Sequence, residues 1–292
     1  MVIVRLIGGL GNQMFQYATA RAIAYRNRST LKLDISFFKN DPKRFYALSH
    51  FNIIEEFASA EEIASFRGSI MKKTCGRVFR FIPSLRPTRL RSIALERRQS
   101  FDPTVLKLPG NIYLVGYWCS EKYFKDIEPV IRREFKVKTP AHHENEALAR
   151  EIFFQQSVSL HIRRGDYVSD PTTYNFHGLC PISYYLEAAN RIAREIDDPH
   201  FYVFSDDKEW IQQYLKLDWR CTYVTHNGPD QDYEDLRLIS QCRHHIIANS
   251  TFSWWGAWLS DYPNKIVFSP KKWFRSMAID TNSIVPPNWR QI

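Results

Sequence analysis

Cysteine is scarce and scattered in this chain, and long apolar runs are absent. The five cysteines include no CxxC pair, which argues against a disulfide framework or a zinc site and favours a reducing compartment. No segment approaches the roughly 20 apolar residues that cross a bilayer. Residues 1–7 also lack the basic region and long apolar stretch of a secretory signal. We therefore expect a soluble, cytoplasmic protein.

The overall composition is that of a globular protein with an anionic partner. The 292 residues are 44% hydrophobic and 15% aromatic, enough to bury substantial cores. A formal net charge of +9 favours a nucleotide-sugar, a nucleic acid or a membrane surface as partner. No nucleic-acid-reading motif is present, so we expect no nucleic acid among the partners.

One segment, residues 67–98, concentrates positive charge. The segment contains a single acidic residue, Glu96. Its basic residues are Arg67, Lys72, Lys73, Arg77, Arg80, Arg86, Arg89, Arg91, Arg97 and Arg98. A solvated surface segment explains this pattern. The alternative is a patch that holds the protein at an anionic membrane, which would make it peripheral to the inner membrane.

Alternating strand and helix patterns predict an α/β fold with parallel sheets. An apolar strand at residues 2–7 leads through a glycine turn into helical spacing at 12–26 and a strand at 31–35. The second half repeats this rhythm, with strands predicted at 157–162, 201–204, 245–248 and 265–268 and helices at 183–196, 208–215 and 253–259. We expect two facing Rossmann-like domains, 1–145 and 146–292, with a cleft between them.

Residues 8–13 (GGLGNQ) join the first predicted strand to the first predicted helix. Backbone N–H groups at such a turn, with the positive end of the helix dipole, suit a pyrophosphate. The segment is neither a P-loop nor a dinucleotide fingerprint, because it lacks Gly-Lys-Ser/Thr and carries Met14 in place of the third glycine. Asn12 and Gln13 add two amides that can bind a phosphate or a sugar hydroxyl. A purely structural turn is the alternative.

Residues 161–167 (HIRRGDY) close a predicted strand, where ligands of open α/β sheets bind. Because strand residues alternate, His161 and Arg163 share one face and Arg164 points elsewhere. One arginine can grip a phosphate with two hydrogen bonds while the other pairs with Asp166. A structural arginine–aspartate network is the alternative.

Two acidic segments follow. Ser205, Asp206 and Asp207 come just after a strand, where a carboxylate can accept hydrogen bonds from guanine, cap the next helix, or bind a metal. Asp230 and Asp232 form a literal Asp-x-Asp, a pattern used by metal-dependent glycosyltransferases. Because the paired arginines can stabilise a leaving diphosphate themselves, we predict that no metal is used.

Residues 249–258 (NSTFSWWGAW) begin another predicted helix. Hydroxyls of Ser250, Thr251 and Ser253 at the helix start can cap it or hold a phosphate. The tryptophans can stack on a sugar, although core packing is expected for at least two of them.

Together these four segments resemble the α-1,2-fucosyltransferases of glycosyltransferase family eleven, and more remotely the α-1,6- and protein O-fucosyltransferases. The matching segments occur in the family's order between residues 8 and 258. The resemblance implies a GT-B fold, with the acceptor largely on the first domain and GDP-fucose largely on the second. It also implies inversion at the anomeric carbon, with no cofactor besides the donor substrate.

By the same resemblance, Arg163 would hold the β-phosphate, His161 would line the donor pocket and Asp206 would read guanine. Gly11 and Asn12 would lie against the diphosphate or fucose. The catalytic candidates are Arg163 and Asp166; the substrate-binding candidates are Gly9, Gly11, Asn12, Gln13, His161, Arg164, Ser205, Asp206, Asn249, Ser250, Thr251 and Ser253. The general base stays open among Asp166, Asp34, His161 and Glu121.

The resemblance favours a terminal β-galactoside of a surface glycan as acceptor. The basic segment 67–98 adds the hypothesis that this acceptor is carried on a lipid at the membrane face. Two other functions are alternatives. One is a fucosyltransferase of another linkage or acceptor, such as protein O-fucosylation. The other is a non-catalytic carbohydrate- or nucleotide-binding module, which would be expected to lose Arg163.

Overall fold

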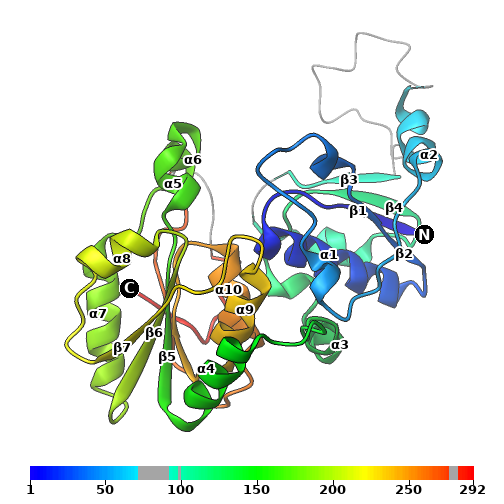
Figure 1. Cartoon of the computed structure of the whole chain (residues 1–292). Coiled ribbons are helices and arrows are strands. Elements are labelled where there is room, and N and C mark those ends of the chain that lie inside the picture. The colour runs from blue at the N-terminus through cyan, green and yellow to red at the C-terminus, as the bar shows by residue number, and fades with distance from the viewer. Residues whose placement is uncertain (72–91, 98–99, 276–281) are drawn as a thin grey trace. The chain divides into compact units, whose positions relative to one another are not determined.

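The computed structural model describes residues 1–71, 92–97, 100–275 and 282–292 (Figure 1). The chain divides into two compact units, Met1–Lys136 and Val137–Ile292. The second unit therefore begins before residue 146, because helix α4 (His143–Phe154) packs against α9 (Asp232–Gln241) of the same unit. Most of the basic segment 67–98 lies outside the described residues.

The first unit is built on a four-stranded parallel sheet with strand order β2-β1-β4-β3. Its strands are β1 (Val2–Arg5), β2 (Leu31–Asp34), β3 (Ile93–Leu95) and β4 (Ile112–Val115). Its helices are α1 (Leu10–Arg26), α2 (Ala60–Met71) and α3 (Glu128–Glu134). Val2, Ile3 and Val4 are fully buried, as expected for a central strand covered on both faces.

The second unit is built on a six-stranded sheet with strand order β10-β9-β8-β5-β6-β7, and all its pairings are parallel. Its strands are β5 (Gln156–Ile162), β6 (Pro199–Ser205), β7 (Arg220–Val224), β8 (His244–Ile246), β9 (Val267–Ser269) and β10 (Arg290–Gln291). Besides α4 and α9, its helices are α5 (Gly165–Ser169), α6 (Pro171–His177), α7 (Ile182–Ala193), α8 (Lys208–Tyr214) and α10 (Thr251–Leu259).

The predicted α/β class and its parallel sheets are confirmed. Each strand and helix expected from the sequence lies within a few residues of an observed element. Strands β3, β4, β7 and β10 and helices α2 to α6 and α9 were not predicted. Among the described residues, no helix is long and apolar enough to span a membrane.

The tryptophan-rich helix α10 belongs to the core of the second unit. Trp254, Trp255 and Trp258 are buried and pack against one another, and the Trp254 indole donates to the main-chain carbonyl of Ile284 at 2.8 Å. The expected core role for at least two of these tryptophans is therefore confirmed.

Candidate active site

The candidate site lies where two neighbouring parallel strands of the second unit end. Strands β5 and β6 pair in register from Gln156 with Pro199 to Ile162 with Ser205. Because the strands are parallel and in step, the residues that follow them, Arg163 and Asp206, emerge side by side. This is the sheet edge at which ligands of α/β proteins bind.

Arg163 bridges two carboxylates at this edge. Its Nη2 lies 2.6 Å from Asp166 Oδ1, and its Nη1 lies 2.9 Å from Asp206 Oδ2. Burial tends to lower the pKa of the guanidinium, but the charges of Asp206 and Asp166 outweigh burial and raise it. Arg163 is therefore a fixed positive charge, and its guanidinium has five N–H donors, more than these two contacts use.

Arg164 is directed to a different set of partners. Its Nε donates to Asp207 Oδ2 at 2.9 Å, and its guanidinium lies 4.1 Å from the centre of the Trp210 ring. Its backbone N–H donates to Asp206 Oδ1 at 2.8 Å. The arginine that pairs with Asp166 is thus Arg163, the residue predicted to hold phosphate, and Arg164 pairs with Asp207.

Asp207 also caps the next helix. Its carboxylate accepts from the backbone N–H of Trp210 at 3.2 Å at the start of α8, and its own N–H donates to Ser205 Oγ at 3.0 Å. The helix-capping alternative therefore holds for Asp207. Asp206, which was predicted to read guanine, is bonded to Arg163 and to the main chain of Arg164.

Gly165 allows the loop and the carboxylate to approach each other. A Cβ atom at this position would lie 2.5 Å from Asp206 Oδ2, closer than any real contact allows. A side chain between Arg164 and Asp166 would therefore displace the Asp206 carboxylate, which glycine leaves in place beside Arg163.

His161, near the carboxyl end of β5, has a buried, neutral imidazole. Its side chain is 5% exposed, its ring packs against Phe252, and its Nδ1 has no hydrogen-bond partner among the described residues. Burial, helped by the charge of Arg163, lowers the pKa of His161 to about 3.

The segment 249–253 combines a structural amide with a helix start. Asn249 is 4% exposed, and its Nδ2 donates to the carbonyls of His177 at 3.1 Å and Trp273 at 3.2 Å. Ser253 is fully buried and its hydroxyl bonds to the carbonyl of Ser250 at 3.2 Å. Asn249 and Ser253 thus shape the loop, which leaves the backbone at Ser250 and Thr251, where α10 starts, as the part of this segment best suited to an anion.

In the first unit, the glycine turn is held by a buried amide. Gln13 is fully buried; its Nε2 donates to the carbonyls of Gly8 and Phe45, and its Oε1 accepts from the N–H of Ala47 at 2.9 Å. Gln13 therefore positions the loop, a role that the sequence did not predict. Gly9 caps α1 without a side chain, while Gly11 and Asn12 lie in its first turn.

Two half-buried acids near the site, Asp232 and Asp235, were not selected from the sequence as ligand-binding residues. Burial, helped by the negative charge of Asp235, raises the pKa of Asp232 to about 7. Burial also raises the pKa of Asp235 to about 6, although the hydrogen bond that Asn227 Nδ2 donates to it at 2.7 Å lowers the pKa. The available signal was their place in the first turn of a helix that follows a parallel strand.

Asp232 was considered as part of an Asp-x-Asp metal pattern with Asp230. Within the described part of the chain, no three histidine, cysteine, aspartate or glutamate side chains gather in a way that could hold a metal ion.

Two of the candidate general bases already have partners. Asp34 is buried and accepts a hydrogen bond from the Tyr113 hydroxyl at 2.6 Å, and Glu121 pairs with Lys125 at 3.2 Å.

Residues 95–292 match the family model described as glycosyl transferase family 11. The chain belongs to glycosyltransferase family 11. It is 35% identical to an α-1,2-colitosyltransferase of Escherichia coli, over 100% of this chain and 99% of that protein. It is 33% identical to the O-antigen biosynthesis glycosyltransferase WbnK of Escherichia coli, over 92% and 93% of the two chains.

A more distant relative is human galactoside α-(1,2)-fucosyltransferase 1, which is 25% identical over 97% of this glycosyltransferase and 75% of the human protein. Among solved structures, the NodZ α-1,6-fucosyltransferase soaked with GDP-fucose has a TM-score of 0.51 at 18% identity, and covers 91% of this chain and 94% of that one. The similarity confirms the predicted GT-B-like fold class.

Proposed function

We propose that this glycosyltransferase moves L-fucose from GDP-fucose to the 2-hydroxyl of a terminal β-galactoside, with inversion at the anomeric carbon. The observation that carries the proposal is the guanidinium of Arg163, fixed between Asp166 and Asp206 at the carboxyl edge of the sheet. The α-1,2 linkage is supported by the colitosyltransferase and the human fucosyltransferase, and the galactoside acceptor by the human fucosyltransferase.

In this reaction the acceptor oxygen bonds to the anomeric carbon as the bond from that carbon to the β-phosphate oxygen breaks. Negative charge then develops on GDP, and a positive group that is already in place stabilises it without reorganisation. Arg163 fits this role because its two carboxylate partners fix its position and leave N–H donors for the diphosphate. The backbone N–H groups at the start of α10 are a second source of donors.

Metal independence is part of the proposal. Arg163 supplies to the diphosphate the positive charge that a divalent cation would otherwise supply. Asp166 positions Arg163, and the base that removes the acceptor proton stays open. The test of the donor does not depend on which residue acts as this base.

The test is to incubate the purified protein with GDP-fucose and lactose in excess EDTA and to follow both GDP and the saccharide product. Fucose on the galactose 2-hydroxyl, with α configuration, supports the donor, linkage, stereochemistry and metal independence together. Activity that requires added magnesium or manganese contradicts metal independence and favours Asp230 and Asp232 as metal ligands.

A second candidate donor is GDP-colitose, favoured by the 35% identity to an α-1,2-colitosyltransferase. Colitose is fucose without the 3-hydroxyl, so the two donors share the diphosphate and differ at one sugar position. A site with a buried polar group for that hydroxyl would reject the deoxy sugar strongly, whereas an apolar site would discriminate weakly. Comparing kcat/KM for both donors with one acceptor decides between them.

The O-antigen relative supports a lipid-linked acceptor and hence contact with a membrane. We propose this contact for the basic segment 67–98, on its charge alone. Vesicles containing anionic lipid should bind the protein, and a variant with several of these arginines changed to glutamine should bind them less. Equal binding of both proteins contradicts the proposal.

A further inference from the structure

The two short helices α5 and α6 follow directly after Arg163 and Arg164, and Figure 1 shows them projecting beyond the carboxyl end of β5. Helix α6 carries exposed aromatic side chains: Tyr174 is 41% exposed and Phe176 is 37% exposed. We name Tyr174, Phe176 and the neighbouring Arg275 the α6 surface. Exposed aromatic side chains near a candidate active site are typical of a ligand-binding surface.

The α6 surface is held in place by defined contacts. The guanidinium carbon of Arg275 lies 4.9 Å from the centre of the Tyr174 ring, and its backbone N–H donates to the Phe176 carbonyl at 3.0 Å. Phe176 packs against Phe274 with ring centres 5.0 Å apart. The aromatic rings are therefore fixed before a ligand binds, which reduces the entropy that binding costs.

A continuous series of ring contacts connects the α6 surface to Arg163. Phe176 contacts His177, whose ring is stacked on Tyr167 with centres 4.6 Å apart and planes 11° apart. Tyr167 in turn lies under the guanidinium of Arg163, 5.5 Å from it. The surface and the phosphate-binding candidate thus belong to one packed cluster within the second unit.

The chemistry of the α6 surface fits a sugar. Aromatic faces receive the C–H side of a pyranose ring, and the guanidinium of Arg275 can donate to its hydroxyls. The Asn175 side chain, 3.5 Å from Arg275 Nη1, adds an amide with donor and acceptor capacity. Sugar sites combine these groups, with apolar surface supplying area and a few polar groups fixing orientation.

We infer that the α6 surface is a binding subsite for the acceptor glycan, in which Tyr174 and Phe176 stack against a hexopyranose ring. The inference rests on the proposed function, which makes Arg163 the group that binds the donor diphosphate. The acceptor must place its hydroxyl next to the anomeric carbon, and the α6 surface is connected to Arg163 through the rings of His177 and Tyr167 while its own aromatic side chains are exposed. Sugar units of the acceptor, and not the nucleotide, are its occupant.

The experiment measures initial rates for Tyr174→Ala and Phe176→Ala with lactose and with N-acetyllactosamine. Removing an apolar contact from a substrate site costs roughly tenfold or more in specificity. We expect kcat/KM for the acceptor to fall about tenfold in each variant. The KM for GDP-fucose and the slow hydrolysis of GDP-fucose without acceptor should stay at wild-type values.

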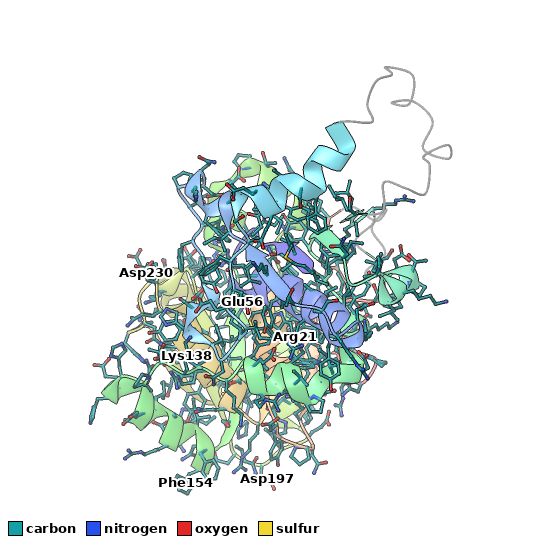
Figure 2. The ribbon with its side chains drawn as sticks, turned by 90° about the vertical axis from the view of Figure 1, so that its right-hand side faces the viewer. Arg21, Glu56, Lys138, Phe154, Asp197 and Asp230 are labelled. Atoms are coloured by element: carbon teal, nitrogen blue, oxygen red, sulfur yellow. The ribbon has the colours of Figure 1, made fainter. Side chains whose placement is uncertain are left out.

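The matched control is Phe154→Ala, which removes an aromatic ring that is 78% exposed at the end of α4 (labelled in Figure 2). Phe154 precedes the first residue of β5, whereas α6 follows the carboxyl end of that strand. This variant should keep wild-type kinetics. Phe154→Ala should unfold at the wild-type temperature, whereas Phe176→Ala also loses the contact with Phe274, so all rates are measured below the unfolding midpoint of each variant.

Three results would overturn the inference: an unchanged acceptor kcat/KM in both variants, an equal loss in the Phe154 variant, or a loss confined to the KM for GDP-fucose. A separate arm measures saturation transfer from the protein to lactose protons in the presence of GDP. If the wild type transfers no fucose, the proposed function fails, and this binding arm still decides the inference. Loss of saturation transfer in Tyr174→Ala supports the subsite, and retention contradicts it.

Discussion

The Oδ2 atom of Asp206 lies 2.9 Å from Nη1 of Arg163, so an ion pair joins the carboxyl ends of strands β5 and β6. The two residues are 43 positions apart in the chain and meet because their strands pair in parallel and in step. The pair fixes the guanidinium of Arg163 at the sheet edge. The placement of this one positive charge underlies the proposed chemistry and the first two predictions.

Arg163→Lys is expected to reduce kcat by about a hundredfold or more, by analogy with the removal of one transition-state donor. Lysine keeps the charge but loses the planar group that reaches Asp166, Asp206 and a diphosphate together. Steady-state rates with GDP-fucose and lactose measure the effect. Arg150→Lys, at a side chain that is 79% exposed, is the control and should keep the wild-type rate. A wild-type rate in Arg163→Lys removes the residue from its assigned role.

Gly165→Ala should lower both activity and stability. The new methyl group would lie 2.5 Å from Asp206 Oδ2 and displace the carboxylate that holds Arg163. Overpacking of this kind costs roughly 1–3 kcal/mol in the free energy of unfolding, measured by denaturant titration. Gly228→Ala is the matched control, because its nearest neighbour beyond the flanking residues, Gln231 Oε1, would be 3.6 Å from the new Cβ. Equal effects of the two substitutions would contradict the steric explanation.

His161→Asn should make the stability of the protein less dependent on pH. The pKa of His161 is lowered to about 3 in the folded protein, against about 6.5 in an unfolded chain. As pH falls below about 6.5, the unfolded state binds a proton that the folded state does not bind, so the free energy of unfolding decreases. The contribution of one such histidine is about 1.4 kcal/mol per pH unit until the folded pKa is reached.

The measurement is the free energy of unfolding of wild type and His161→Asn between pH 6.5 and pH 4. The variant should lose less stability over this range. His143→Asn, at an exposed histidine at the start of α4, controls for the introduced asparagine. Parallel curves for wild type and His161→Asn would mean that the His161 imidazole takes up its proton alike in both states.

Asn249→Ala should destabilise the second unit. The substitution leaves the carbonyls of His177 and Trp273 without the buried amide that donates to them, at a cost of roughly 1–3 kcal/mol. Asn52→Ala is the control, because this exposed amide also donates to a main-chain carbonyl, that of Lys136 at 3.2 Å. Denaturant unfolding should show a large loss for Asn249→Ala alone. Similar small losses for both would show that water replaces the Asn249 amide.

Much of the fold could be predicted because its signals are local. The apolar strands at 2–7 and 157–162, the glycine turn at 8–11 and the helical spacing at 12–26 each follow from residues close together in the chain. Strands β8 and β9 are as short as β3, but adjacent β-branched residues mark them in the sequence, whereas β3 (Ile93–Leu95) and β10 (Arg290–Gln291) lack such pairs. Their position was decided by pairing with strands distant in the sequence.

The candidate site was predicted in part. The sequence placed Arg163 and Asp206 at strand ends and identified both as candidates, because ligand sites of parallel sheets lie there. It assigned the partner of Asp166 to one of the two arginines without deciding which. The role of Gln13 was missed, since a buried amide that binds a loop has the same one-dimensional pattern as an amide that binds a ligand.

The sequence by itself determined the α/β class, the strand-to-loop positions of the polar segments and the arginine pair, since each depends on periodicity or on neighbouring residues. Only the tertiary structure decided which arginine meets which carboxylate, why residue 165 must be glycine, and that rings from Tyr167 to Phe176 form one cluster reaching Arg163. These relationships depend on strand register and side-chain packing between distant segments. Register and packing are set when the whole unit folds, because they minimise buried charge and empty space across residues that the chain alone does not bring together.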